Sequence, residues 1–431
     1  MNRFDEIIGY DNIKAEVRRY CDVLKNLDKY KALGVDTPRG LILYGDPGVG
    51  KSLMAKCLID ESGLKSYIVR KDKPDGEFIT HIQEVFKQAK ETAPSIIMLD
   101  DMDKFANEDD QHKDAEEYVA VQACIDECKG SDVFVIATVN DRWCLPDSLT
   151  REGRFNKMIR MDVPAGDDAI KILAHYMTKK KCVNDIDTEE IAGAIGSRSC
   201  ATLETVINEA GIFAVFAGRN HIGRDDMFRA CIKSHFACLI GDSRSGTISE
   251  KERQRVAIHE AGHATASEAL RPGRTTFVAL GTDYSGAVEG ITICKKDNDG
   301  SQFIKKKERR IMEGLAGMAA IEIATGEHDL GCNEDLERSF DIEKDIVLED
   351  AAHGFEHYRW MYGERSEKHM ADVEHVVSSE IKRLYEEVRK LIINNRPFLD
   401  AVTNELMEHD YITSKDITRI RETVGIVSTN D

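Results

Sequence analysis

A glycine-rich loop between an apolar run and a helix-forming run constrains the fold of this chain more than any other feature. The loop, residues 45–52 (GDPGVGKS), fits the G-x-x-x-x-G-K-[ST] pattern. Residues 41–44 before it predict a buried parallel strand, and residues 53–58 after it predict a helix. In this order, backbone N–H groups can wrap nucleotide phosphates at a helix N-terminus. Lys51 would reach the β- and γ-phosphates, and Ser52 would ligate Mg²⁺. The residues predicted to bind the nucleotide are Asp46, Pro47, Gly48, Val49, Gly50, Lys51, Ser52 and Leu53.

Two further apolar runs end in side chains that suit phosphoryl chemistry. Residues 96–99 (IIML) lead into Asp100 and Asp101, and residues 133–138 (VFVIAT) lead to Asn140. Both runs predict buried strands. Asp100 is predicted to hold Mg²⁺ through water, Asp101 to polarise the attacking water, and Asn140 to orient that water or the γ-phosphate. The N-terminal part of the chain is therefore predicted to bind and hydrolyse ATP.

A second motif, HEAGH at residues 259–263, lies about 200 residues further along the chain. Residues 251–270 contain no proline and predict one helix, on which His259 and His263 face the same side. Two histidines at this spacing can bind one Zn²⁺, and Glu260 lies close enough to deprotonate its water. Taken alone, the pattern also fits a surface helix that matches by chance. A catalytic zinc ion requires a third protein ligand.

Several stretches of the sequence resemble the FtsH-type AAA+ metalloproteases. The matching text includes FDEIIGYDNIKAEV, TPRGLILYGDPGVGKSLMAK, FKQAKETAPSIIMLDDMD, REGRF, INEAGIFA and HEAGH. The resemblance covers nearly the whole chain. It implies an α/β P-loop AAA+ module, with a parallel sheet, flanking helices and a helical lid, followed by a mainly α-helical zinc metalloprotease domain. The implied domains are a large nucleotide-binding subdomain (1–165), a small helical lid (166–240), a linker (241–247) and the protease (248–431).

The resemblance also implies roles for residues outside the two motifs. The adenine would lie near Ile8 and Gly9, and Ser199, Cys200 and Ala201 occupy the usual small-residue sensor position. Arg151 and Arg154, in REGRF, would be arginine fingers, although two arginines in a loop are by themselves usually surface charges. Fingers stabilise charge on a neighbouring subunit's nucleotide, so they imply a ring, and the family implies a hexamer.

The third zinc ligand is likewise implied by the resemblance. The family takes an aspartate about 70 residues after the zinc motif, beyond a helix rich in glycine and alanine. Residues 314–320 (GLAGMAA) resemble that helix, and Asp335 in GCNEDL matches the ligand position. Glu334 and Asp329 are competing acids nearby.

Two more segments of the C-terminal half have expected structures. Residues 288–293 (VEGITI) predict a strand, and by resemblance it is an edge strand that pairs with extended substrate. An ordinary strand with no substrate role is the alternative. Residues 365–422 predict a run of amphipathic helices.

The sequence departs from the family in the segments that grip substrate. The pore loop of the family carries an aromatic–hydrophobic–glycine triplet, whereas residues 68–78 are polar and their only aromatic, Phe78, belongs to the next predicted helix. Residues 106–117 replace a glycine-containing second pore loop with an acidic stretch. Asp101 stands where many relatives have Glu, one methylene longer. These departures predict weak unfolding of folded substrates.

Composition excludes some partners and compartments. Acidic residues outnumber basic ones, giving a net charge of −19, which argues against a nucleic-acid partner. The eleven cysteines are scattered singly and are expected to be reduced thiols. No apolar run approaches the ~18 residues of a membrane helix. We therefore expect a cytoplasmic protein, or a soluble piece of a membrane-anchored one.

Three hypotheses follow for the function. The main one is an ATP-dependent zinc endopeptidase that uses ATP, Mg²⁺ and Zn²⁺ and acts on unfolded or loosely folded proteins as a homo-oligomer. The second is a zinc peptidase whose weak ATPase regulates the site without threading folded protein. The third is a non-proteolytic AAA+ remodeller with a vestigial zinc site.

Overall fold

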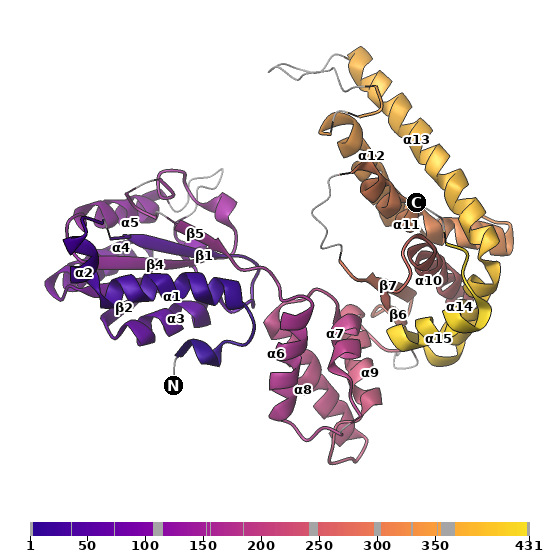
Figure 1. Cartoon of the computed structure of the whole chain (residues 1–431), viewed down its shortest axis with the longest axis horizontal. Helices are drawn as coiled ribbons and strands as arrows, with labels where there is room; N and C mark the ends of the chain where they lie inside the picture. Colours follow the sequence, from indigo (N-terminus) through magenta and orange to yellow (C-terminus); the bar gives the residue numbers. More distant parts are fainter. Residues whose placement is uncertain are drawn as a thin grey trace. The chain divides into compact units, whose positions relative to one another are not determined.

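The structure is a computed structural model, and it describes most of the chain (Figure 1). The described residues are 3–35, 37–72, 74–106, 115–151, 153–155, 157–183, 185–240, 249–296, 303–328, 331–350, 352–354 and 367–428. The predicted linker 241–247, the competing acid Asp329 and most of the predicted second pore loop lie outside these residues. Contacts divide the chain into two compact units, Met1–Lys180 with Ser197–Thr205, and Lys181–Gly196 with Val206–Asp431.

The first unit contains a five-stranded parallel sheet in the order β2-β3-β4-β1-β5. Helices α1 and α3 cover one face of this sheet, and α4 and α5 cover the other (Figure 1). The predicted strands are confirmed, and β3 and β4 are buried along their whole length, as expected for central strands of a parallel sheet. The strands are β1 (Gly40–Tyr44), β2 (Lys65–Val69), β3 (Ser95–Leu99), β4 (Val133–Val139) and β5 (Lys157–Arg160). The helices are η1 (Arg3–Glu6), α1 (Asp11–Lys25), α2 (Leu27–Ala32), α3 (Lys51–Ser62), α4 (Asp75–Glu91), η2 (Met102–Lys104), α5 (Ala115–Glu127), η3 (Arg142–Cys144) and α6 (Asp167–Thr178).

The strand order explains how distant motifs meet. Strands β3, β4 and β1 are neighbours and run in the same direction, so their carboxyl ends lie at one edge of the sheet. The P-loop follows β1, Asp100 follows β3, and Asn140 follows β4. Phe78 is fully buried in α4, edge-on to Phe105 with ring centroids 5.1 Å apart. It therefore belongs to the core rather than to a loop, as the sequence predicts.

Between the sheet and the protease motif the chain is helical, in keeping with the predicted lid. The remaining helices here are α7 (Thr188–Ile195), α8 (Cys200–Phe216) and α9 (Arg224–His235). Helices α7 and α9 contact strand β6 (Thr275–Thr282), and the ring of Phe228 stacks on that of Phe277 at 6.0 Å. These contacts place α7, α9 and most of α8 in the second unit. The predicted domain boundaries stay a prediction.

The second unit combines helices with a three-stranded antiparallel sheet in the order β7-β6-β8. Its other elements are α10 (Glu250–Leu270), β7 (Val288–Cys294), α11 (Ile304–Thr325), α12 (Asn333–Leu348), α13 (Glu367–Asn394), α14 (Arg396–His409), β8 (Tyr411–Thr413) and α15 (Ser414–Val424). The predicted strand over 288–293 and the helix over 251–270 are confirmed.

One prediction for this unit is wrong in part, because the run of helices predicted over 365–422 is interrupted by β8. Asp410 ends α14 in the left-handed conformation with φ 61°, and the next three residues pair with β6. The partner strand lies more than 130 residues away, so helical periodicity gives no sign of it.

No single helix among the described residues has both the length and the apolar content to span a bilayer. In the described part of the chain, α7 and α8 taken together, as a bent pair, satisfy those two criteria.

Candidate nucleotide and metal sites

The glycines of the P-loop are required by its geometry. Gly45, Gly48 and Gly50 have φ values of 145°, 79° and 101°, which side-chain-bearing residues rarely adopt. A Cβ atom on Gly45 would lie 2.0 Å from the carbonyl oxygen of Met161. Helix α3 begins directly after Gly50, so its unpaired N–H groups face the loop and can bind phosphate.

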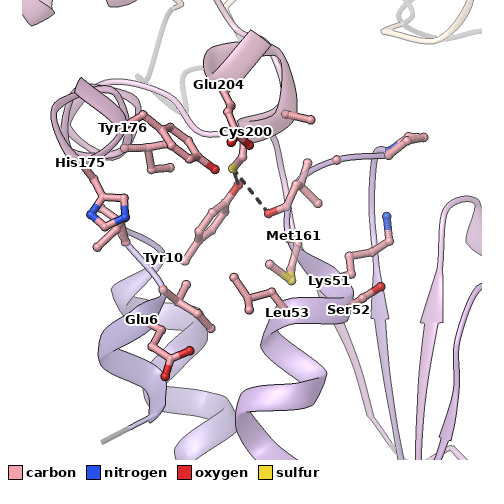
Figure 2. Close-up of a pocket in the computed structure, with 18 of the residues that line it drawn as sticks. Glu6, Tyr10, Lys51, Ser52, Leu53, Met161, His175, Tyr176, Cys200 and Glu204 are labelled. Carbon is pink, nitrogen blue, oxygen red and sulfur yellow. Dashed lines mark hydrogen bonds between the residues drawn. The ribbon is translucent and has the colours of Figure 1, made fainter. Parts of the chain in front are cut away.

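A cavity of about 770 Å³ lies beside the P-loop in the first unit (Figure 2). The predicted residues that line it are Ile8, Pro47, Gly48, Val49, Gly50, Lys51, Ser52, Leu53, Asp101 and Asn140. Two other predicted nucleotide residues contact the P-loop residues. The backbone carbonyl of Asp46 accepts a hydrogen bond from Lys51, and the carboxylate of Asp100 accepts one from Ser52. Gly9 has φ 72°, and a Cβ there would lie 2.9 Å from the Asp168 carboxyl group. The volume and lining suit a nucleotide.

Several cavity residues were missed by the sequence reasoning, among them Tyr10, His175 and Tyr176. The Tyr10 hydroxyl points toward Cys200 (Figure 2) and lies 3.6 Å from its Sγ. It donates to the carbonyl oxygen of Asp162 at 2.9 Å. Tyr10 has φ 56°, unusual for an aromatic residue. In the sequence, the position of Tyr10 directly after Ile8 and Gly9 was the one sign that it lines the cavity. His175 and Tyr176, in α6, belong to no motif.

The side chains of Lys51 and Asn140 are hydrogen-bonded to each other. Lys51 Nζ donates to Asn140 Oδ1 at 2.9 Å and to the carbonyl oxygens of Gly45 and Asp46 at 2.6 and 2.9 Å. Burial lowers the pKa of Lys51, although Asp101 and other acids nearby oppose that shift. A γ-phosphate would replace these neutral partners with a charged one.

Asp100 is held by groups from three segments of the chain. Ser52 Oγ and Thr138 Oγ1 each donate to its Oδ1 at 2.8 Å, and Arg70 Nε donates to its Oδ2 at 2.8 Å. Burial raises the pKa of Asp100, but these hydrogen bonds outweigh it and hold the pKa below its usual value. A hydroxyl and a carboxylate side by side at a helix N-terminus fit Mg²⁺ together with nucleotide phosphates. Asp101 pairs with Lys104, with a separation of 2.7 Å.

The two arginines predicted as fingers have different surroundings. Arg151 is exposed. Arg154 donates to both carboxylate oxygens of Asp126, at 3.1 and 2.7 Å, and this pair together with Lys129 lowers the pKa of Asp126 to about 2. Neither arginine lines the cavity of its own chain. Because a finger acts on a neighbouring subunit, the finger role stays a prediction, and Arg154 would have to leave Asp126 to perform it.

In the second unit, the three predicted metal ligands converge on one point. His259 Nε2 lies 2.9 Å from His263 Nε2 and 3.1 Å from Asp335 Oδ2, and His263 Nε2 lies 3.2 Å from the same oxygen. Ligands of a tetrahedral zinc ion are about 3.3 Å apart when the metal–ligand bonds are about 2.0 Å. Among the described residues, no other group of three His, Cys, Asp or Glu side chains converges in this way. The donor set fits Zn²⁺ with a fourth position left for water or substrate.

Backbone contacts orient the ligands. His263 Nδ1 donates to the carbonyl oxygen of Glu313 at 2.7 Å, which leaves the lone pair of Nε2 for a metal. Burial lowers the pKa of His263, but Asp335, Glu260 and the Glu313 carbonyl outweigh it and raise the pKa to about 9. Both imidazoles hold the pKa of Asp335 well below its usual range against the opposing effect of burial.

Glycines on α10 and α11 let the ligand-bearing helices approach closely. A Cβ on Gly317 would lie 2.5 to 2.7 Å from three atoms of the His259 ring. A Cβ on Gly262 would lie 2.5 Å from the carbonyl oxygen of Ala316. The small residues over 314–320 are therefore explained by the packing of the two helices, with His259 held between them.

Glu260, the predicted base, is enclosed by strand β7. Thr292 Oγ1 lies 2.7 Å from Glu260 Oε2, to which it donates. A Cβ on Gly290 would lie 2.4 Å from Glu260 Cγ, so glycine makes room for the acid. The side chain faces a cleft of about 1070 Å³ that the three ligands and residues 288–292 also line. In the described part of the chain β7 pairs only with β6, so its other edge carries no strand.

Comparisons with known proteins agree with both sites. Residues 41–163 match AAA, the ATPase family associated with various cellular activities, and residues 246–420 match peptidase family M41. The chain is 29% identical over 450 residues to ATP-dependent zinc metalloprotease FtsH 2 of Symbiobacterium thermophilum, covering 97% of this chain and 74% of the relative. It is 28% identical to FtsH of Thermobaculum terrenum, covering 98% and 69%, and 28% identical to FtsH of Helicobacter felis, covering 98% and 70%.

The chain belongs to the FtsH-type zinc metalloproteases. In this FtsH-type chain, the AAA match contains the P-loop, the two acids after β3 and both predicted fingers. The M41 match contains the HEAGH motif and Asp335. Ile8 and Gly9 precede the first match, so their part in adenine binding depends on the cavity and on the resemblance alone.

Proposed function

We propose that this FtsH-type chain is an ATP-dependent zinc endopeptidase in which a ring of ATPase modules delivers protein substrates to the metal site. The observation that carries the proposal is the convergence of His259, His263 and Asp335 beside Glu260, in a cleft bordered by an open strand edge. A zinc ion bound there would polarise the scissile carbonyl and activate water.

The residues of the chain have separate tasks in this reaction. Glu260 accepts a proton from the attacking water and donates it to the leaving amine. Thr292 holds the Glu260 carboxylate in place. The free edge of β7 would pair with the backbone of an extended peptide, which binds many sequences because it reads no side chain. Lys51, Ser52 and Asp100 would hold ATP and Mg²⁺, and Asp101 and Asn140 would place the attacking water.

Degradation of casein by the zinc-loaded protein tests this function. We expect ATP to stimulate cleavage, and we expect the Glu260→Gln variant to lose cleavage while it retains zinc. Absence of stoichiometric zinc in the purified protein would favour the non-proteolytic remodeller. Cleavage that is indifferent to ATP would favour the regulatory ATPase instead.

A specific observation supports the regulatory ATPase as a second candidate. The segment at the pore-loop position offers no aromatic side chain for gripping, because Phe78 is buried in the core. This candidate predicts degradation of loose chains but not of a stable folded domain, even with ATP. A folded fluorescent substrate, followed beside unfolded casein, distinguishes the two candidates.

We further propose that the chain works as a hexamer in a reducing compartment such as the cytoplasm. The fingers Arg151 and Arg154 need a neighbouring subunit, which supports a ring. All eleven cysteines are free thiols, which supports a reducing compartment. Native mass spectrometry with Mg²⁺ and a non-hydrolysable ATP analogue tests the assembly, and a persistent monomer would contradict it.

A further inference from the structure

The guanidinium group of Arg70 lies at the acid where a divalent cation is expected. Arg70 directly follows β2, and its Nε and Nη2 atoms lie 2.8 and 2.5 Å from Asp100 Oδ2. The Asp100 side chain is only 6% exposed, whereas that of Arg70 is 54% exposed. An accessible cation therefore covers a buried acid that is predicted to hold magnesium.

With Arg70 in place, Asp100 has no acceptor position left. A carboxylate offers about four lone-pair positions, two on each oxygen. Oδ1 accepts from Ser52 and Thr138, and Oδ2 accepts from two nitrogens of Arg70. A magnesium ion, or the water molecules around it, can reach this acid only where a present partner withdraws. Arg70 is the only one of these partners that is largely exposed, and its positive charge also repels a divalent cation.

The residue after Arg70 is tied to another buried acid. Lys71 Nζ lies 3.8 Å from Glu117 Oε1, and the Glu117 side chain is 2% exposed. Glu117 lies in the first turn of α5 and is the last residue of the segment predicted as the second pore loop. Two consecutive residues thus fasten the segment after β2 to the magnesium position and to α5. This is the segment where the family resemblance places the first pore loop.

We propose that Arg70 competes with magnesium for Asp100 and that Mg²⁺–ATP binding displaces it, which releases the segment over residues 70–72. In this arrangement the ATPase site controls the position of a charged segment at the place of the pore loop. The inference rests on the proposed function, because it requires that the first unit bind Mg²⁺–ATP.

The competition is tested by titrating free Mg²⁺ while following the binding of a fluorescent ATP analogue. In Arg70→Ala, we expect the half-saturating Mg²⁺ concentration to fall about three- to tenfold, the range for removal of a competing charged contact. Arg70→Lys keeps the positive charge but loses the two-nitrogen contact. Its half-saturating Mg²⁺ concentration should therefore lie between those of the wild type and Arg70→Ala. Lys56→Ala removes the same charge from an exposed position of α3 and should match the wild type.

The release of the segment is tested by limited trypsin digestion, with cleavage after Lys71 followed by mass spectrometry. In the wild type, Mg²⁺ with a non-hydrolysable ATP analogue should accelerate this cleavage. In Arg70→Ala the cleavage should be fast without nucleotide and change little when it is added. Thermal unfolding of each variant checks that the fold is intact, and Arg70→Lys supplies the test if Arg70→Ala does not fold.

The outcomes separate the two proposals. Failure of the wild type to bind nucleotide with Mg²⁺ would overturn the proposed ATPase function. The wild type could instead bind nucleotide in a Mg²⁺-dependent way, while Arg70→Ala shows the same Mg²⁺ dependence and the same cleavage. That result would overturn the proposed role of Arg70 and leave the ATPase function standing.

Discussion

In the metal site, three ligand atoms lie 2.9 to 3.2 Å apart and face a common centre, whereas in the nucleotide site the two acids after β3 are each paired with a cation of the same chain. His259 is fixed between α10 and α11, where glycines leave room for its ring. Asp100 and Asp101, in contrast, are bound by Arg70 and Lys104 of the same chain. Arg154, which does not line the cavity, is likewise bound by Asp126.

The two sites differ in the step at which the free-energy cost of ordering their side chains arises. The metal ligands are positioned by close packing, so most of their ordering cost is met when the protein folds. The ion pairs of the nucleotide site include half-exposed partners and must be exchanged when ligand arrives. Substitutions beside the metal should therefore change stability and zinc affinity, and substitutions at the nucleotide site should change ligand dependence and turnover.

The substitution with the largest expected effect should abolish the activity of the metal site and leave that of the nucleotide site unchanged. Glu260→Gln should reduce peptide hydrolysis about 10⁴-fold, because the amide cannot accept the proton of the water. Zinc content and ATPase turnover should remain at wild-type values. A discontinuous peptidase assay, metal analysis and an ATPase assay on one preparation check this. A variant that keeps a tenth of the peptidase activity would remove Glu260 from the role of base.

A second substitution should produce the reverse pattern. Arg154→Ala should lower ATPase turnover about 10³-fold if Arg154 acts as a finger. The zinc content should not change. Asp126→Ala is the matched variant, since it removes the ion-pair partner and keeps the arginine, and its turnover should equal or exceed that of the wild type. Turnover in Arg154→Ala that stays at the wild-type value under oligomer-forming conditions would exclude the finger role.

Packing around the metal is tested by Gly317→Ala. The added methyl group would overlap the His259 ring, so we expect a loss of about 1–3 kcal/mol in the free energy of unfolding and a 10- to 100-fold weaker zinc affinity. Gly76→Ala is the control, because a methyl group there meets no atom within 4 Å. Thermal unfolding and competition with a zinc chelator measure both quantities. Equal behaviour of the two variants would mean that the site is looser than its geometry indicates.

The smallest expected effect concerns the support of the base. Thr292→Val keeps the side-chain shape but removes the hydroxyl group that bonds Glu260, and kcat should fall about tenfold. KM and zinc content should hold steady. Thr292→Ser should restore most of the activity, because it returns the hydroxyl group. If the serine variant is as slow as the valine variant, the hydroxyl group does not position the base.

Local patterns in the sequence predicted much of the fold and many members of both candidate sites. The P-loop, the strand ends at Asp100 and Asn140, and the His259–His263 spacing are each encoded within a few neighbouring residues. The parallel sheet follows from buried apolar runs that lead into these motifs. Asp335 could be nominated only through the family resemblance, since 72 residues separate it from His263.

What could not be predicted depends on contacts between distant segments. Arg70 looks like a polar loop residue until the sheet places β2 beside β3, and the contact with Asp100 then follows. Gly317 looks like one small residue among several until α11 packs on the His259 ring. Strand β8 is three residues long and exists because β6 offers a partner. No periodic or motif signal at these positions indicates the contact that each one makes.

The open edge of β7 has a consequence for handling the protein. Unpaired N–H and C=O groups along a strand can join the sheet of any neighbouring molecule, so the same edge is a route to aggregation at high concentration. Glu289, Lys295 and Lys296, in the strand and just beyond its end, are charged, and such residues discourage unwanted edge-to-edge pairing. Neutralising Lys295 and Lys296, which do not line the cleft, should lower solubility.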